Sequence, residues 1–152
     1  MRISIVAAFA LFAGAPLFAQ SAIPDLSTAT PLAGNWVYST SATGSEATFV
    51  NASAMPQLTL RCTRATRRVT LAKPATGAAP YLGVWTSSAT RNLLASYNPA
   101  TGRVSADLAG SDALLDAIAF SRGRFAVIVT GQPPLVVPAW AEAQRVIEDC
   151  RA

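Results

Sequence analysis

Short stretches in which polar and apolar residues alternate follow one another along most of the chain. Between Gln57 and Thr63, the residues Leu58, Leu60 and Cys62 fall on one face, and polar residues fall on the other. A period of two is typical of a β-strand with one buried face. Other stretches, recognised by alternation or by their β-branched and aromatic composition and separated by turn residues, cover residues 36–39, 47–51, 68–73, 81–86, 91–97, 103–108, 125–130 and 135–137. We therefore predict a mainly β domain, either a sandwich or a partly closed barrel of about 8–10 short antiparallel strands.

One segment between these strands has helical spacing instead. Leu114 and Ile118 lie one helical turn apart within residues 112–121, and either Ser111 or Asp112 can cap the start. The spacing predicts a short helix that interrupts the run of strands.

The C-terminal segment, residues 140–151, has the same helical character. Its apolar residues Trp140, Ala143, Ile147 and Cys150 are spaced to form one stripe along a helix. We predict a terminal helix that packs this stripe, Cys150 included, against the sheet.

The N-terminal residues have the pattern of a secretory signal peptide. Arg2 precedes an apolar run over residues 3–12, which only Ser4 interrupts, and small residues lead to a cleavage site after Ala19 or, alternatively, after Ala22. This run is about ten residues long, against the roughly 20 that a membrane-spanning helix needs. We expect export, either to a periplasm or to the outside of the cell. The chain then divides into a cleaved signal, a flexible leader and a single β-rich domain, residues 1–20, 21–33 and 34–152.

Export changes the interpretation of the two cysteines. In an oxidising compartment a pair of cysteines in a small domain is typical of a disulfide. Cys62 lies on the inward face of its predicted strand, and Cys150 lies on the inward face of the terminal helix. Two thiolates without histidine make a poor metal site. We therefore predict a Cys62–Cys150 disulfide and no metal.

The composition excludes several functional classes. The chain has 152 residues, of which 51% are hydrophobic and 13% charged, and it contains no histidine. A packed domain is expected, and every mechanism that needs an imidazole is excluded. The net charge of +4 is too small to indicate a nucleic-acid partner. We expect no transmembrane segment after signal cleavage, because no later apolar stretch reaches about 18 residues.

Residues suited to catalysis are sparse. Lys73 with Ser87 or Ser88 would be a Ser–Lys pair, but the chain lacks the S-x-x-K spacing. We interpret the acidic residues near the two predicted helices as caps and exposed charges, namely Asp112, Asp116, Glu148 and Asp149. The prediction is a non-enzymatic protein with no catalytic residue and no cofactor.

Four arginines gather around one predicted hairpin, at Arg61, Arg64, Arg67 and Arg68. Such a cluster can bind a carboxylate, a phosphate or an acidic partner. It can equally be a solvated edge whose charge prevents aggregation. No aromatic residue lies between Arg61 and Arg68, which disfavours single-stranded nucleic acid as a partner.

Trp140 is a second candidate for contact with a partner. It follows Pro134 and Pro138 at the junction between the last strand and the terminal helix. Tryptophan is favoured as an anchor in protein interfaces. The same residues also suit a purely structural closure of the domain.

The order of these features resembles that of small periplasmic β proteins of Gram-negative bacteria. The features are an export signal, Gly34 and Trp36 opening a strand, a strand ending at Cys62, and a terminal helix carrying Cys150. Within that group the chain is similar to the invasion-associated locus B type and to the periplasmic accessory protein of type VI secretion. The opening at Gly34 also resembles that of secreted inhibitors of bacterial metalloproteases, which use an N-terminal tail, although Cys150 departs from their pattern. No catalytic residue follows from any of these resemblances.

We therefore expect a binding or accessory protein of the cell envelope whose partner is another protein. The contact residues would be Arg61, Arg64, Arg67, Arg68 and Trp140. The alternative is an inhibitor of an exported enzyme in which the leader, Ser21 to Leu32, enters the target's cleft. An enzyme of unknown chemistry is the third class.

Overall fold

The computed structural model describes residues 24–152, so the predicted signal peptide and the start of the leader lie outside the described residues. The described part contains ten strands, two α-helices and one 3₁₀ turn. The elements, in chain order, are β1 (Gly34–Ser41), β2 (Gly44–Asn51), β3 (Pro56–Thr63), η1 (Arg64–Thr66), β4 (Arg68–Pro74), β5 (Tyr81–Trp85), β6 (Thr90–Leu94), β7 (Ser96–Asn98), β8 (Arg103–Ala109), α1 (Ala113–Ala119), β9 (Arg124–Val129), β10 (Leu135–Pro138) and α2 (Ala141–Asp149).

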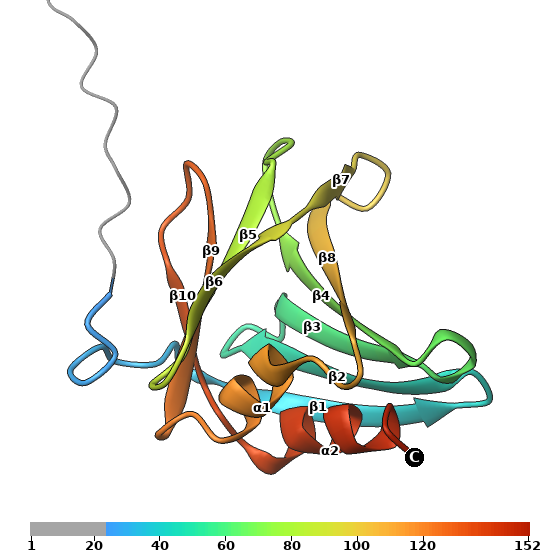
Figure 1. Cartoon of the computed structure of the whole chain (residues 1–152). Helices are drawn as coiled ribbons and strands as arrows, with labels where there is room; N and C mark the ends of the chain where they lie inside the picture. Colours follow the sequence, from blue (N-terminus) through green and yellow to red (C-terminus); the bar gives the residue numbers. More distant parts are fainter. Residues whose placement is uncertain (1–23) are drawn as a thin grey trace, which may run out of the picture.

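The strands form two antiparallel sheets that share one core. The larger sheet has the order β1-β2-β3-β4-β8-β7, and the smaller has the order β10-β9-β5-β6. Figure 1 shows the two sheets leaning towards each other, with α1 and α2 together at the lower end of the view. The predicted mainly β fold is confirmed, and because the sheets do not close into a barrel, it corresponds to the sandwich rather than the barrel alternative.

Aromatic side chains connect the two sheets in the core. Phe49 of β2 and Phe125 of β9 are fully buried, and the Trp36 ring lies 5.4 Å from the first and 6.4 Å from the second. The Trp36 indole also donates a hydrogen bond of 2.9 Å to the backbone oxygen of Pro138, at the end of β10. Trp36 therefore fixes the start of the larger sheet to the edge of the smaller one.

The stretch 91–97, predicted as one strand, is divided between the two sheets. Leu94 ends β6 in the smaller sheet and Ser96 begins β7 in the larger one, with the Ala95 amide bonded to the Pro80 oxygen at 3.0 Å. Alternation of side chains shows that a stretch is extended, but it does not encode which neighbour the stretch pairs with. The sequence therefore located the extended segment without its change of sheet.

The helix α1 begins as the sequence predicts. Of the two candidate caps, Asp112 is the N-cap, and its side chain accepts a hydrogen bond of 2.8 Å from the Leu114 amide. Leu114, Leu115 and Ile118 are buried.

The terminal helix starts one residue later than its apolar stripe suggested. Trp140 has extended backbone as the N-cap and is 44% exposed, so its place in the buried stripe was wrong. The Ala139 amide still bonds to the Gly123 oxygen, which keeps the chain extended up to this point. Ala143, Val146 and Ile147 form the buried face instead.

The predicted disulfide is present. Cys62 in β3 and Cys150 at the end of α2 are bonded, with their Cα atoms 5.4 Å apart. Both residues are buried, which confirms that the strand face and the helix face meet. Within the described part of the chain, neither helix is long and apolar enough to cross a bilayer.

Candidate functional site

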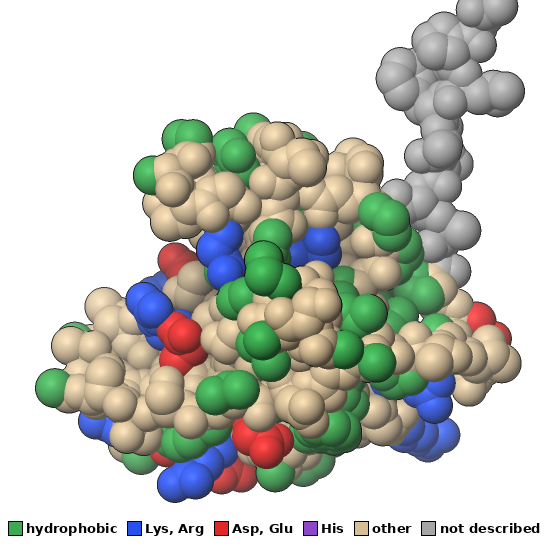
Figure 2. All heavy atoms as spheres, turned by 180° about the vertical axis from the view of Figure 1, so that it is seen from behind, with side chains coloured by type: hydrophobic (Ala, Val, Ile, Leu, Met, Phe, Trp, Pro, Cys, Tyr) green, Lys and Arg blue, Asp and Glu red, His purple; other side chains and the backbone are tan. Residues whose placement is uncertain are grey.

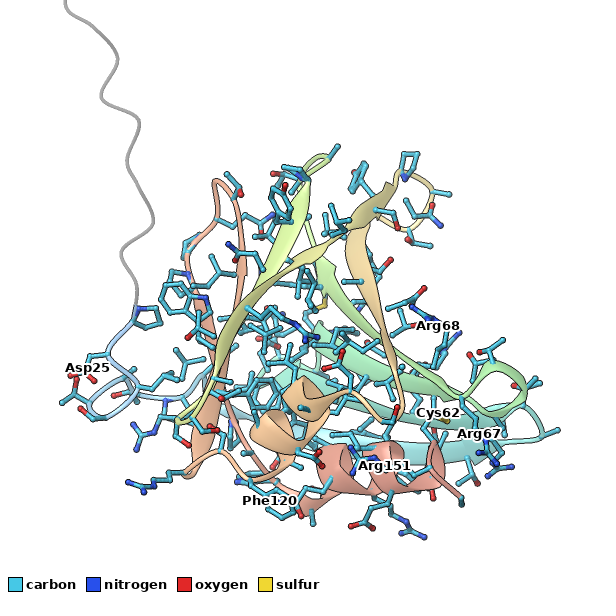
Figure 3. The ribbon with its side chains drawn as sticks, in the orientation of Figure 1. Asp25, Cys62, Arg67, Arg68, Phe120 and Arg151 are labelled. Carbon is cyan, nitrogen blue, oxygen red and sulfur yellow. A yellow bond between two sulfur atoms is a disulfide. The ribbon has the colours of Figure 1, made fainter. Side chains whose placement is uncertain are left out.

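The predicted arginine cluster lies on the hairpin formed by β3, η1 and β4, but its four side chains do not converge. Arg61 projects from the outer face of β3 and pairs with Glu46 of β2, with a shortest N to O distance of 2.6 Å. Arg68 begins β4, and its guanidinium donates to the Asp107 oxygen at 3.2 Å. Figure 3 shows Arg67 towards Arg151, with Arg68 higher in the view.

Arg64 and Arg67 occupy the tip of this hairpin. Their side chains make no hydrogen bond or salt bridge with other described residues. Arg67 has a φ of +49°, the left-handed region that non-glycine residues rarely adopt. Its amide bonds to the Arg64 oxygen and its own oxygen accepts from Gly110, so the tip is held in one shape by backbone contacts.

A hollow of about 570 Å³ lies against this tip, between the hairpin and the end of α2. Arg151 spans it by donating to the Gly110 oxygen and to Asp116, both at 2.7 Å. The lining consists of Thr66, Arg67, Ala109, Gly110, Ser111, Asp116, Cys150 and Arg151. The basic tip, defined as Arg64 and Arg67, therefore borders a recess whose far wall already carries an ion pair.

The same end of the molecule holds a hydrogen bond between Tyr38 and Asp149. The Tyr38 hydroxyl donates to the Asp149 carboxylate at 2.6 Å, and the Arg145 guanidinium lies 4.4 Å above the Tyr38 ring. The hydrogen bond raises the pKa of Tyr38 and lowers the pKa of Asp149, and the charges of Arg145 and Arg64 lower the latter further. This contact holds the end of α2 on β1.

Trp140, the other predicted contact residue, lies at the start of α2, whereas the basic tip adjoins its end. The nine residues of that helix correspond to about 14 Å. Phe120, which is 78% exposed, follows α1, and the Gln144 amide of α2 bonds to the oxygen of neighbouring Ala119. The structure thus places Trp140 apart from the arginines, so the two predicted contacts are separate surfaces.

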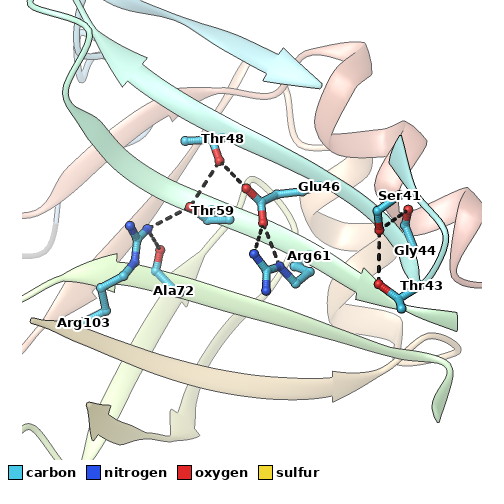
Figure 4. A network of polar contacts seen from close by, with 9 residues as sticks. All are labelled: Ser41, Thr43, Gly44, Glu46, Thr48, Thr59, Arg61, Ala72 and Arg103. Carbon is cyan, nitrogen blue, oxygen red and sulfur yellow. Dashed lines mark hydrogen bonds and ion pairs between the residues drawn. The ribbon is translucent and has the colours of Figure 1, made fainter. Parts of the chain in front are cut away.

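A polar network on the outer face of the larger sheet includes a residue that the sequence analysis did not single out. Arg103 of β8 donates from one nitrogen to the Thr59 hydroxyl at 2.8 Å and to the Ala72 oxygen at 3.0 Å. Figure 4 shows Arg103 on one side of Thr59 and the Glu46–Arg61 pair on the other. The available signal was parity, because Arg103 shares the outward face of its strand with Ser105 and Asp107.

The residues considered for catalysis are placed in structural roles. Lys73 is buried, which lowers its pKa, and it donates to Gln132 at 2.6 Å. Ser87 accepts a hydrogen bond from the Arg122 amide. Asp112 pairs with Arg91 at 2.7 Å, and this hydrogen bond lowers the pKa of Asp112.

Among residues 24–152, no group of three or more acidic or thiol side chains is placed to hold a metal ion. The face seen in Figure 2 carries basic and acidic side chains in several small groups among hydrophobic and neutral ones.

The described part of the leader lies on the domain. The Leu32 amide donates to the Val136 oxygen at 2.8 Å, and the Arg124 guanidinium donates to the Ala29 oxygen. For the leader to enter the cleft of a target enzyme, these contacts would have to open.

Comparison of the chain with models of known protein families, with curated proteins and with solved structures finds no match. The resemblance to periplasmic accessory proteins therefore stays a prediction.

Proposed function

We propose that the protein is a non-enzymatic binding protein of the bacterial envelope that uses the basic tip, Arg64 and Arg67, to bind an acidic segment of another protein. The observation that carries the proposal is that neither guanidinium group makes a hydrogen bond or salt bridge with a described residue, although the charge of Arg64 acts on Asp149. Most acidic groups near them are already engaged, Asp149 with Tyr38 and Asp116 with Arg151. Charge complementarity at such a surface favours an acidic partner.

Rigidity of the tip supports the same proposal. The 3₁₀ turn η1, the left-handed Arg67 and the Gly110–Arg67 backbone bond define its shape. The disulfide between Cys62 and Cys150 joins the adjacent strand to α2. A surface that is ordered before binding loses less conformational entropy when the partner binds.

An exported, oxidising location is part of the proposal. The disulfide supports it, because such bonds persist in the periplasm and outside the cell and are rare in the cytosol.

The test is binding of a fluorescein-labelled hexaglutamate peptide, followed by fluorescence anisotropy at low and at physiological salt. The Arg64→Ala, Arg67→Ala double variant should bind about tenfold more weakly, since each exposed ionic contact contributes up to about 1 kcal/mol. The control variant, Arg91→Ala with Arg122→Ala, removes the same charge elsewhere and should bind within about twofold of the wild type.

Cross-linking capture from the native envelope then extends the test from the peptide to a physiological partner. A partner retained by the control variant and lost from the basic-tip variant supports the proposal. Equal binding by both variants, or no binding of the peptide by the wild type at low salt, would refute it.

A further inference from the structure

The outer face of the larger sheet has a hollow of about 430 Å³ that is separate from the basic tip. This volume lies within the range of about 300–1,000 Å³ typical of small-molecule sites. All but one of its lining residues are of polar type, namely Glu46, Thr59, Arg61, Thr63, Thr70, Asn98, Thr101, Arg103 and Ser105, and the exception is Ala72.

The strand register explains why a recess forms here. Thr59, Ala72 and Ser105 lie side by side across β3, β4 and β8 with their side chains on the outer face. All three are small, and alanine, the smallest, is central. The larger side chains of Arg61 and Arg103 stand at the sides, so the floor is low and the rim is charged.

Arg103 supplies a positive charge that no carboxylate contacts directly. Its hydrogen bonds to Thr59 and Ala72 both use the same terminal nitrogen, and among the described residues its other two nitrogens have no partner. The nearby Glu46 carboxylate is engaged by Arg61 at 2.6 Å and by the Thr48 hydroxyl at 3.2 Å. Partial burial, which removes some of the water around the guanidinium, lowers the pKa of Arg103.

A partly buried guanidinium with free N–H groups can bind an anion, because its fork geometry matches two oxygens of a carboxylate or phosphate. The surroundings of that charge define the rest of the ligand. The hydroxyls of Thr59, Thr70 and Ser105 line the hollow. Thr59 accepts from Arg103 and Thr70 donates to Asp107. Each hydroxyl has one proton and two lone pairs, so bonding capacity remains for the hydroxyls of a polyol. A recess of this volume holds more than a simple ion.

We propose that this outer-sheet hollow binds a small polyhydroxylated anion, a sugar acid or sugar phosphate, with Arg103 holding the acid group and the threonine and serine hydroxyls holding the sugar. This inference is independent of the basic tip, because the residues that line the hollow include neither Arg64 nor Arg67. No aromatic side chain lines the hollow, so the charge of Arg103 carries recognition and a neutral sugar binds poorly.

The experiment titrates the ¹⁵N-labelled protein separately with glucuronate, glucose 6-phosphate, glucose and inorganic phosphate. The two sugar anions should shift the amides of residues 59, 72, 103 and 105 at millimolar concentration and leave those of residues 64 and 67 in place. Glucose should shift them only at concentrations at least about tenfold higher, since it lacks the charge-assisted contact. Comparison of glucuronate with glucose 6-phosphate identifies the preferred acid group.

The variant Arg103→Gln retains a side-chain donor and should weaken binding of the sugar anion about tenfold or more. Arg122→Gln is the control, because this arginine lies outside the hollow and should leave the affinity unchanged. If Arg103→Gln perturbs folding, the amide shifts of the wild-type protein still test the proposal, because they locate the bound ligand without any substitution. Equal affinity for glucose and glucuronate, shifts confined to residues outside the hollow, or a response to inorganic phosphate alone would overturn the proposal.

Discussion

Replacing Cys62 and Cys150 by alanine removes the covalent bond that joins β3 to the end of α2. The two residues are separated by 88 positions, so the bridge restricts most of the unfolded domain. The chain-entropy relation for a loop of this length gives about 4.5 kcal/mol. Residual structure in the unfolded chain reduces this value, and we expect a measured loss of about 3–4 kcal/mol. That loss is a large part of the 5–15 kcal/mol typical of a whole domain.

The assay is equilibrium unfolding in urea, followed by tryptophan fluorescence and circular dichroism. With a slope of about 2 kcal/mol per molar urea, the midpoint of the double variant should fall by about 1.5–2 M. The slope itself should rise, because the unlinked chain exposes more surface on unfolding. Hydrogen exchange should show the largest loss of protection in α2, which the bridge holds on the sheet.

Reduction of the wild-type protein separates the cross-link from the packing of the two side chains. Cys62 and Cys150 are 2% and 1% exposed, so a reductant reaches the bridge only when the protein unfolds. Unfolding with dithiothreitol present should reproduce most of the loss seen in the alanine variant. A loss below about 1 kcal/mol in both experiments would refute the entropic argument, and a loss in the variant alone would assign the effect to packing.

Two further substitutions test contacts that hold the core and the first helix. Trp36→Phe removes the indole donor to the Pro138 oxygen and some buried volume, and it should cost about 2 kcal/mol in urea unfolding; a cost below about half a kcal/mol would show that the hydrogen bond contributes little. Asp112→Asn keeps an N-cap acceptor but loses the charge that pairs with Arg91, and it should cost about 0.5–1 kcal/mol at neutral pH. Because folding lowers the pKa of Asp112, its contribution is present above the unfolded value of about 3.9 and is lost as the pH falls through the lower folded value. The difference between this variant and the wild type should therefore disappear in strong acid, and a difference that persists there would contradict the charge-based explanation.

The polar network around Arg103 illustrates what a one-dimensional pattern leaves out. The alternation in residues 103–108 was an available signal that Arg103 faces outward, as the structure shows. Its partner Thr59, however, is 44 positions away in the chain. Only the pairing of β4 between β3 and β8 brings the two together, and strand pairing depends on the fold of the whole domain.

The arginine hairpin shows the converse, because residues that are close in the chain are separated in the structure. The sequence places Arg61, Arg64, Arg67 and Arg68 close together, and proximity in the chain suggests one cluster. The structure pairs Arg61 with Glu46 on the neighbouring strand and leaves Arg64 and Arg67 at the tip. The strand register places Arg61 and Arg68 on the outer face of the sheet, whereas η1 and the left-handed turn at Arg67 keep the other two arginines at the tip.

The sequence by itself determined the features that local chemistry controls. Periods of two and of 3.6 residues located most strands and both helices, Asp112 was one of two recognised caps, and the inward parity of Cys62 and Cys150 predicted the bridge. Tertiary structure alone decided the change of sheet at Ala95, the exposure of Trp140 and the hollow beside Arg103. These features depend on which distant segments meet, and the free energy that selects those meetings comes from burying the shared core rather than from any local segment.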